Sequence, residues 1–357
     1  MKKVLVVMTG GTIGSRSQGT AIDVDAAFGY ELLRRYEEEY GKQAEFTVIQ
    51  PFTLLSENLL PQDWTRLRRA VDESGPAGYD GIVITHGSDT LAYSAAAISY
   101  SFADSPIPIL ITASNYPLDD PRSEGVRNFA ACIAMILHDP LPGVFVVFED
   151  RKRTLVHLGT RIRQSQPFTD RIVSIHDEPF GEIEEGRLRL HPSPYNPEPA
   201  QLRRFEQRQS LELPAGASFG DILYLTPYPG FRYSYLKVRD MERKPHAVLI
   251  DLYHSGTTGV RFASPEDSLE RFASECREAG IHLYAAPMNR QEGSLYASSH
   301  VFIDYGIQPL GGISVEAALV KLMFAYGIYA DDQHTDQKAI ENLLKQNLFF
   351  EIAAARQ

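Results

Sequence analysis

The feature that most constrains the fold is a run of apolar residues that ends abruptly in two glycines and a threonine. Residues 4–8 are Val-Leu-Val-Val-Met, and Thr9-Gly10-Gly11-Thr12 follows at once. A run that is apolar at every position is typical of a central parallel strand, which is buried on both faces. The glycines allow a sharp turn and a close approach of other backbone. Thr12 is therefore expected just beyond the strand, where open α/β sheets bind ligands.

A second stretch repeats this layout. Residues 81–85 read Gly-Ile-Val-Ile-Thr, and His86-Gly87-Ser88-Asp89-Thr90 follows. The carboxyl ends of neighbouring parallel strands meet at one edge of a sheet. If the two strands are neighbours, Thr12, Ser88 and Asp89 lie around one crevice.

Strand-like apolar runs alternate with helical patterns along the whole chain, which predicts an α/β fold with helices on both faces of a parallel sheet. The proline-rich segment 191–199 is incompatible with a helix or a central strand. We therefore expect an N-terminal domain over 1–195, a linker over 196–218 and a smaller α/β domain over 219–357. In the second domain, Ser264 and Pro265 resemble the N-cap and first residue of a helix. The expected strands are residues 4–8, 46–49, 82–85, 107–111, 144–148, 223–226, 247–253 and 281–285.

Composition narrows the class of protein. The net charge of −11 argues against nucleic-acid or anionic-membrane partners, which require basic surfaces. The two cysteines, Cys132 and Cys276, are expected as buried free thiols. The start of the chain carries too short an apolar run for a signal peptide, and no run approaches the roughly 18 residues of a membrane span. We expect a cytoplasmic protein.

The residues at the two strand ends suggest acyl transfer or amide hydrolysis without a metal or cofactor. A threonine or serine hydroxyl becomes a nucleophile when a base removes its proton, and Asp89 is the nearest candidate to assist. Backbone N–H groups around Gly10-Gly11 and Gly87-Ser88 are candidate donors to a developing oxyanion. A phosphate loop does not fit, because neither a following Lys-Ser/Thr nor a Gly-x-Gly-x-x-Gly spacing is present. The ten histidines show no metal-ligand spacing.

Simpler interpretations remain open at this point. Thr12 and Thr85 can act as helix caps, and Asp89 can be an N-cap. The loop residues Ser56-Glu57-Asn58 follow the expected strand 46–49 and can point into the same crevice, with Glu57 suited to a substrate ammonium, or they can form an ordinary capping loop. His86 is more often a structural histidine than a base.

Together these motifs resemble the L-asparaginase/glutaminase family of the bacterial two-domain type, most of all its cytoplasmic type I branch. Thr9-Gly10-Gly11-Thr12-Ile13-Gly14 is similar to the first family signature, and His86-Gly87-Ser88-Asp89-Thr90 to the second, which usually reads His-Gly-Thr-Asp-Thr. The resemblance continues in order through Arg122–Asn128, Tyr228-Pro229-Gly230 and residues 314–322. It implies a flavodoxin-like N-terminal domain, a smaller C-terminal α/β domain, and a homodimer or homotetramer.

The resemblance also implies roles for individual residues. Thr12 corresponds to the family nucleophile, and Ser88 and Asp89 to the hydroxyl and carboxylate that assist it. The substrate, a small amino-acid or peptide amide, is expected to contact Gly11, Ser56, Gly87 and Ser114. From the residues themselves we add Glu57, Arg161 and Arg163 as candidate contacts. No metal and no cofactor are implied.

Four positions depart from the family pattern. The stretch Gly159–Gln164 contains no lysine where the family has one, and an arginine there stays protonated. The tyrosine expected near residues 17–20 is missing, Gly256 is followed by Thr257 instead of asparagine, and Glu57 stands where small or amide residues are usual. These changes leave three interpretations. The favoured one is an amidohydrolase that uses Thr12 as the nucleophile and hydrolyses the side-chain amide of asparagine or of a related amino acid or peptide. The others are a ligand-binding protein on the same scaffold and a related aspartyl-transfer or isomerisation step.

Overall fold

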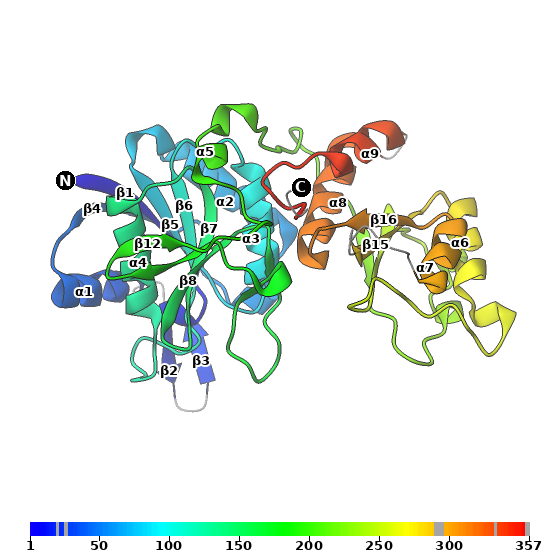
Figure 1. Ribbon diagram of the computed structural model, residues 1–357, viewed down its shortest axis with the longest axis horizontal. Coiled ribbons are helices and arrows are strands. Elements are labelled where there is room, and N and C mark those ends of the chain that lie inside the picture. The colour runs from blue at the N-terminus through cyan, green and yellow to red at the C-terminus, as the bar shows by residue number, and fades with distance from the viewer. Residues whose placement is uncertain (19–20, 25–27, 289–295, 332–333, 354–357) are drawn as a thin grey trace. The chain divides into compact units, whose positions relative to one another are not determined.

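The computed structural model describes residues 1–357 except 19–20, 25–27, 289–295, 332–333 and 354–357 (Figure 1). The chain forms two compact units. The first comprises Met1–Leu211 with Leu348–Phe350, and most of the second comes from Glu212–Asn347, with a short piece that begins at Glu351. The division at Leu211 falls inside the range 196–218 that the sequence assigns to a linker.

The first unit is built on an eight-stranded sheet with the order β12-β11-β8-β7-β6-β5-β1-β4. The strands β4, β1, β5, β6 and β7 are mutually parallel. This part agrees with the parallel sheet that the apolar runs predict. The strands are β1 (Lys2–Met8), β4 (Ala44–Ile49), β5 (Gly81–Thr85), β6 (Pro108–Thr112), β7 (Gly143–Asp150), β8 (Arg153–Leu158), β11 (Gly181–Glu184) and β12 (Arg187–Leu190).

The sheet continues in an antiparallel direction that the sequence did not predict. Strands β8, β11 and β12 pair antiparallel beyond β7. Their outer members carry charged residues, such as Glu182, Glu184, Arg187 and Arg189. A strand with one solvated face contains no continuous apolar run, so the polar stretch after Arg151 did not indicate a strand.

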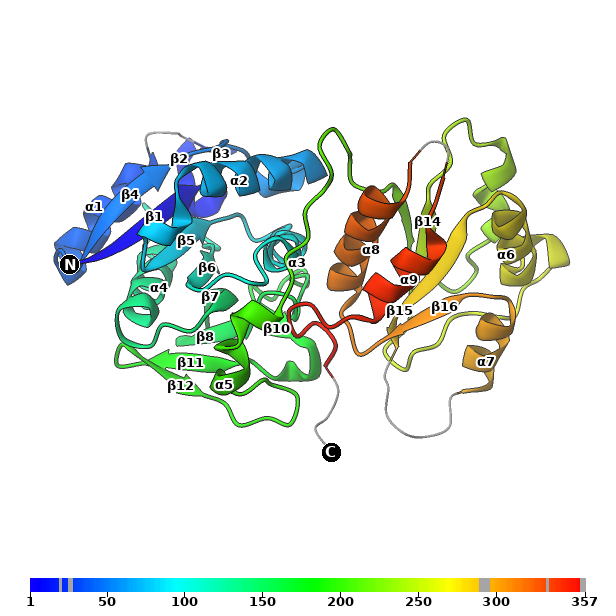
Figure 2. The same ribbon diagram turned by 90° about the horizontal axis from the view of Figure 1, so that it is seen from above.

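Helices cover both faces of this sheet (Figure 2). Figure 2 shows α1 (Phe28–Tyr40) and α4 (Gly125–His138) on one face, and α2 (Pro61–Glu73) and α3 (Leu91–Ser101) on the other. Almost every position of α3 is buried, which is typical of a helix surrounded by protein. Shorter elements are the hairpin strands β2 (Ser15–Gln18) and β3 (Ala21–Val24), the pair β9 (Ile162–Arg163) and β10 (Val173–Ser174), and α5 (Pro199–Leu202).

The second unit is a smaller α/β layer. Its four strands are parallel in the order β13-β14-β15-β16. They are β13 (Ile222–Leu225), β14 (Ala247–Asp251), β15 (His282–Met288) and β16 (Gln308–Gly311), with helices α6 (Leu269–Glu278), α7 (Ala297–Asp304), α8 (Val315–Tyr329) and α9 (Gln337–Lys345). None of the helices in the described ranges is long and apolar enough to cross a membrane.

The two cysteines lie in helices of different units. Cys132 is in α4 and Cys276 is in α6, and both are buried free thiols, as the sequence predicts. Burial raises the pKa of the Cys276 thiol to about 12. Both side chains therefore act as small apolar core residues.

The start of α6 corrects one expectation. Residues Pro265–Asp267 form only a short 3-10 turn, and α6 begins at Leu269. Its N-cap is Ser268, whose hydroxyl accepts a hydrogen bond from the Arg271 N–H at 3.2 Å. Two serines four residues apart both satisfy the capping pattern, and the sequence alone did not distinguish them.

Candidate active site

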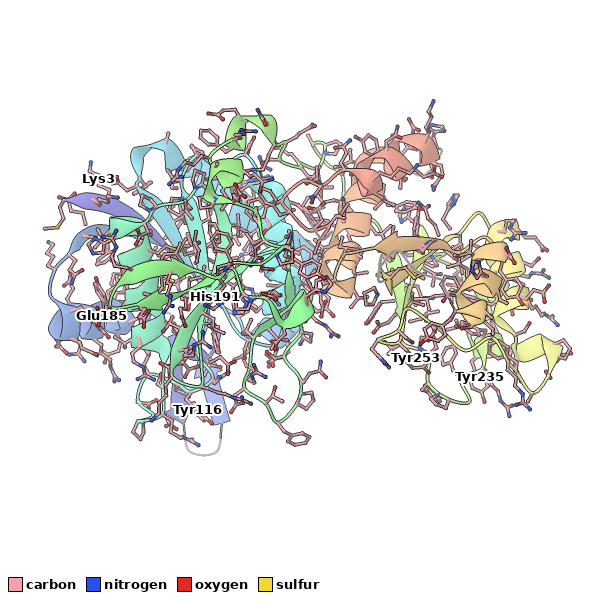
Figure 3. The ribbon with its side chains drawn as sticks, in the orientation of Figure 1. Lys3, Tyr116, Glu185, His191, Tyr235 and Tyr253 are labelled. Carbon is pink, nitrogen blue, oxygen red and sulfur yellow. The ribbon has the colours of Figure 1, made fainter. Side chains whose placement is uncertain are left out.

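The polar motifs that follow β1 and β5 lie side by side. Strands β1 and β5 are parallel neighbours, and Met8 is paired with Thr85 at their carboxyl ends. Thr12 begins a short 3-10 turn beyond β1, and Ser88 and Asp89 lie between β5 and the start of α3. Figure 3 shows this edge of the unit at the end marked by Tyr116, opposite Lys3 at the start of β1.

Gly11 and Gly87 bring the two motifs into backbone contact. Gly11 has a φ of +75°, and a Cβ atom built on it would lie 2.4 Å from the Gly87 nitrogen. A Cβ atom on Gly87 would lie 2.4 Å from the Ser56 hydroxyl oxygen. Only glycine fits at either position without displacing its neighbour. The structure therefore gathers Gly11, Gly87 and Ser56, three of the predicted site residues.

The loop after β4 holds the β1 motif in place. Leu54 donates its N–H to the Thr9 carbonyl at 3.2 Å and accepts the Gly11 N–H at 3.1 Å. The Gly11 N–H is therefore engaged and is not a donor to an oxyanion, which corrects the expectation for that glycine. The candidates that remain among the predicted donors are the N–H groups of Gly10, Gly87 and Ser88. Those of Gly87 and Ser88 lie close to the positive end of the α3 dipole.

The three groups expected to carry the chemistry are accessible and uncommitted. Thr12 and Ser88 are half-buried and Asp89 is exposed. In the part of the chain that the structure describes, no hydrogen bond engages either side-chain hydroxyl or the Asp89 carboxylate. Two hydroxyls and a carboxylate are thus left available to a ligand at the carboxyl edge of the sheet.

The helix-capping alternative does not describe the β5 motif. The N-cap of α3 is Thr90, with no side-chain capping bond, and the Thr90 hydroxyl instead donates to the Ser56 carbonyl at 2.9 Å. The sequence did not single out Thr90, although its place in the motif was the available signal. Thr85 contacts the Met8 sulfur at 3.4 Å.

His86 has the structural role that the sequence favoured. The residue is 2% exposed, and burial lowers its pKa. Nδ1 lies 2.8 Å from the Gly87 carbonyl oxygen. Because a carbonyl only accepts, Nδ1 carries the proton and donates it. This bond fixes the turn in which Gly87 and Ser88 lie.

Two other residues predicted to bind the substrate differ in their exposure to solvent. Glu57 is exposed beside the buried Ser56 and is free to meet a substrate at this edge. Ser114 is fully buried, and its hydroxyl donates to the Tyr116 carbonyl at 2.6 Å. Ser114 therefore shapes the turn after β6. A cavity of about 430 Å³ adjoins that turn and includes Asn115, Tyr116 and Glu124 in its lining.

Among the described residues, no ion pair joins Asp89 to either of the two arginines proposed to replace the family lysine. The Arg161 side chain is buried, and its guanidinium donates to the carbonyls of Phe350 and Tyr195, each at 2.6 Å. Arg163 is exposed on the short strand β9. Gln164, the next residue, donates from Nε2 to the Asp89 carbonyl oxygen. The sequence did not reveal this role of Gln164, because the resemblance directs attention to a cation in that stretch.

The family tyrosine position near residues 17–20 lies partly outside the described residues, at 19–20. A metal site is a separate question. Among the residues that the structure describes, no group of three or more His, Cys, Asp or Glu side chains is arranged to hold a metal ion.

Comparison with known proteins identifies the family. A family model described as "Asparaginase, N-terminal" matches residues 3–196, which is more than half of the 357 residues. This range contains the whole edge described above. The chain belongs to the asparaginase family.

Relatives of known sequence and solved structures agree with this assignment. An L-asparaginase of Thermococcus kodakarensis is 28% identical over 362 residues, covering 99% of this chain and 100% of that one. A protein of Metallosphaera sedula, named as a subunit of glutamyl-tRNA(Gln) amidotransferase, is 26% identical and covers 96% of this chain, which spans 76% of that protein. The solved thermostable L-asparaginase from T. kodakarensis matches 99% of both chains with a TM-score of 0.75 and 25% identity.

A further solved structure, L-asparaginase I from Vibrio cholerae, matches with a TM-score of 0.73 and 99% coverage of both chains. At 22% identity this match supports the fold. The protein is accordingly an asparaginase-family amidohydrolase with the two α/β units that the resemblance implied.

Proposed function

We propose that this amidohydrolase hydrolyses the side-chain amide of asparagine, or of a related amino acid or peptide, with Thr12 as the nucleophile. The observation that carries the proposal is the set of uncommitted groups at one sheet edge: the hydroxyls of Thr12 and Ser88 and the carboxylate of Asp89. The backbone contact between Gly11 and Gly87 supports it, because it brings their two motifs together.

The chemistry runs through an ester. The Thr12 oxygen attacks the amide carbon as its proton is removed, and the resulting oxyanion accepts hydrogen bonds from backbone N–H groups. The amide nitrogen takes up a proton and leaves as ammonia. Water then attacks the acyl-threonine ester, releases the carboxylate and restores the hydroxyl. Ser88 and Asp89 assist the proton transfers, and Gln164 positions Asp89 through its carbonyl.

The substrate is held by the residues around this centre. Ser56 and Gly87 meet at the base of the edge, and the exposed Glu57 carboxylate suits a substrate ammonium. The cavity of about 430 Å³ beside Tyr116 offers room for residues that flank asparagine in a peptide. We extend the proposal to a homodimer or homotetramer located in the cytoplasm, and light scattering of the purified protein tests the oligomeric state.

The test is ammonia release from L-asparagine, L-glutamine and asparagine-containing peptides by wild type, Thr12→Ala and Thr12→Ser. We expect Thr12→Ala to lose turnover by at least about 10³-fold, because nucleophile removal costs that much in hydrolases of this type of chemistry. Thr12→Ser keeps a hydroxyl and should retain part of the rate. Circular dichroism and melting temperature control for folding. Unchanged turnover by a folded Thr12→Ala would refute the assignment.

A second candidate function follows from the relatives named as amidotransferase subunits. In that case the chain would act together with a partner protein on an amide-transfer reaction. Wild-type protein that releases no ammonia alone, and gains release when its partner is supplied, favours this second function. A ligand that raises the melting temperature and is never consumed would instead favour the binding-protein interpretation.

A further inference from the structure

The second unit contains a polar cavity far along the chain from the proposed catalytic residues. Its volume is about 240 Å³. It lies at the amino ends of β15 and β16, where His282 and Gln308 begin these strands, and its lining includes Arg277 from α6 and Glu341 from α9. Pockets for drug-sized ligands are about 300–1,000 Å³, so this cavity suits a smaller molecule.

Two opposite charges line the cavity without neutralising each other. Among the described residues, the Glu341 carboxylate has neither an ion pair nor a hydrogen-bond donor. Arg277 has no carboxylate partner there, and Nη2 donates to the Tyr305 carbonyl at 2.7 Å. On the same helix, Arg271 pairs with Glu275 at 3.0 Å. Arg277 therefore differs from Arg271 in having no carboxylate partner among the described residues.

The structure holds the Arg277 head group in a defined place. A Cβ atom built on Gly306, whose φ is +85°, would lie 3.2 Å from Nη2. A side chain at that position would crowd the guanidinium. With one N–H fixed on Tyr305, the rest of the planar fork is available for a carboxylate.

The polar groups at the floor of the cavity already form hydrogen bonds with one another. The Tyr284 and Tyr326 hydroxyls lie 3.1 Å apart, and Gln337 Nε2 donates to the Tyr284 oxygen at 3.0 Å. Both tyrosines are almost fully buried. A network of this kind does not rearrange easily, so it fixes α9, and with it Glu341, against the sheet.

His282 and Gln308 supply neutral polar groups between the two charges. Burial lowers the pKa of His282, and the nearby Glu341 charge opposes this effect. The ring is therefore neutral near pH 7 and can both donate and accept. The Gln308 amide forms no side-chain hydrogen bond within the described residues.

We propose that this cavity binds a free α-amino acid with a polar side chain. The ligand carboxylate lies on Arg277, its ammonium lies on Glu341, and its side chain lies against His282 and Gln308. A simple anion would contact only Arg277, which is exposed, and a simple cation would contact only Glu341, which is half-buried. A small zwitterion can contact both charged groups of the cavity at once. This inference does not depend on the proposed function.

The test is calorimetric titration of L-asparagine into the full-length Thr12→Ala protein, in which turnover is expected to be absent. We expect two binding sites per chain, one at the catalytic edge and one in this cavity. Adding Glu341→Gln should remove one of them or weaken it at least tenfold. Adding Arg271→Gln, which removes a cation from the same helix outside the cavity, should leave both. N-acetyl-L-asparagine, which lacks the ammonium, should not occupy the cavity.

The outcomes separate the two proposals. A single site that Glu341→Gln removes would support the cavity and count against asparagine at the catalytic edge. A single site that Glu341→Gln and Arg277→Gln leave unchanged would overturn the cavity proposal, as would the absence of binding at millimolar asparagine. The melting temperatures of the variants should stay close to that of Thr12→Ala, because neither side chain has an ion-pair partner to lose.

Discussion

The backbone of Gly11 lies so close to the backbone of Gly87 that no residue with a side chain would fit at position 11. Its φ is +75°, and its would-be Cβ atom meets the Gly87 backbone. Gly41 has the same φ of +75° but has nothing within 4 Å. Both Gly→Ala variants share the left-handed backbone penalty of about 1–2 kcal/mol, and only Gly11→Ala adds a clash.

We therefore predict that Gly11→Ala loses most of the amidohydrolase activity and destabilises the protein more than Gly41→Ala does. Gly41→Ala should keep wild-type activity. Urea unfolding and ammonia release measure the two effects. Equal losses of activity and of unfolding free energy in Gly11→Ala and Gly41→Ala would show that the contact between Gly11 and Gly87 contributes to neither.

Gln164 gives a second prediction for a single residue. Its Nε2 donates to the Asp89 carbonyl, so Gln164→Met removes the donor while keeping the length of the side chain. We expect kcat to fall about tenfold or more, the usual scale for a lost positioning hydrogen bond of about 1.4 kcal/mol, with a smaller change in KM. Gln164→Lys, which keeps a donor, should retain more activity.

Gln43 provides the matched control for Gln164. Its amide also donates to a backbone carbonyl, that of Tyr40 at 3.0 Å, at an exposed site. Gln43→Met should leave kcat and KM unchanged. If Gln164→Met also leaves both unchanged, Gln164 is not a positioning residue for Asp89.

At the scale of elements, a buried ion pair joins α8 to the segment that begins at Glu351. Lys321 Nζ lies 2.7 Å from Glu351 Oε1, and the two side chains are 1% and 0% exposed. The ammonium also donates to the Leu344 carbonyl at 3.3 Å. The apolar pattern of α8 gave no hint of this pair, because it placed Lys321 on a helix without a partner.

We predict that Glu351→Gln destabilises the second unit by about 3–5 kcal/mol, because it leaves a buried charge uncompensated. The double variant Lys321→Met, Glu351→Leu should lose less than the sum of its two single changes. The double-mutant cycle compares urea unfolding of the wild type, Lys321→Met, Glu351→Leu and the double variant. Strict additivity would show that the two side chains are not coupled.

The sequence predicted those elements whose burial leaves a continuous apolar run. The runs at residues 4–8 and 82–85 identified β1 and β5, and the polar motifs after them led to Thr12, Ser88 and Asp89. The antiparallel strands β11 and β12 were missed because solvated strands carry alternating charges. Strand β8 is buried over residues 155–158, but it was missed because its apolar run is short and is interrupted by His157.

Arg161 shows a different limit of sequence reasoning. The carbonyls that hold it belong to Tyr195 and Phe350, which are distant in sequence. No local pattern distinguishes an arginine that is satisfied by remote carbonyls from one that faces a ligand. The contact between Gln164 and Asp89 was missed for the same reason. At the end of β9, the sequence does not show whether Arg163 or Gln164 faces the site.

At the scale of the whole molecule, histidines whose pKa values are lowered by desolvation make the stability depend on pH. Burial lowers the pKa of His157 to about 4, and it also lowers the pKa values of His86, His176 and His282. The unfolded chain binds protons near pH 6.5 while the folded protein does not. The stability that these histidines contribute is therefore complete above about pH 6.5 and falls as the pH drops toward 4.

For His157 alone this difference corresponds to about 3 kcal/mol at pH 4. We predict that the free energy of urea unfolding declines between about pH 6.5 and 4 and that His157→Gln makes this decline shallower. The variant should be less stable at neutral pH, where the bond between Nδ1 and the Ser174 hydroxyl at 2.8 Å is lost. An unchanged pH slope in the variant would assign the decline to other groups.

The identity of the nucleophile decides whether the two strand ends form one catalytic centre. The most direct measurement is mass spectrometry of enzyme that is acid-quenched within milliseconds of mixing with a saturating amide substrate. We predict an acyl adduct on the peptide that contains Thr12, and no adduct in Thr12→Ala. An adduct on Ser88 or on any other residue would contradict Thr12 as the nucleophile.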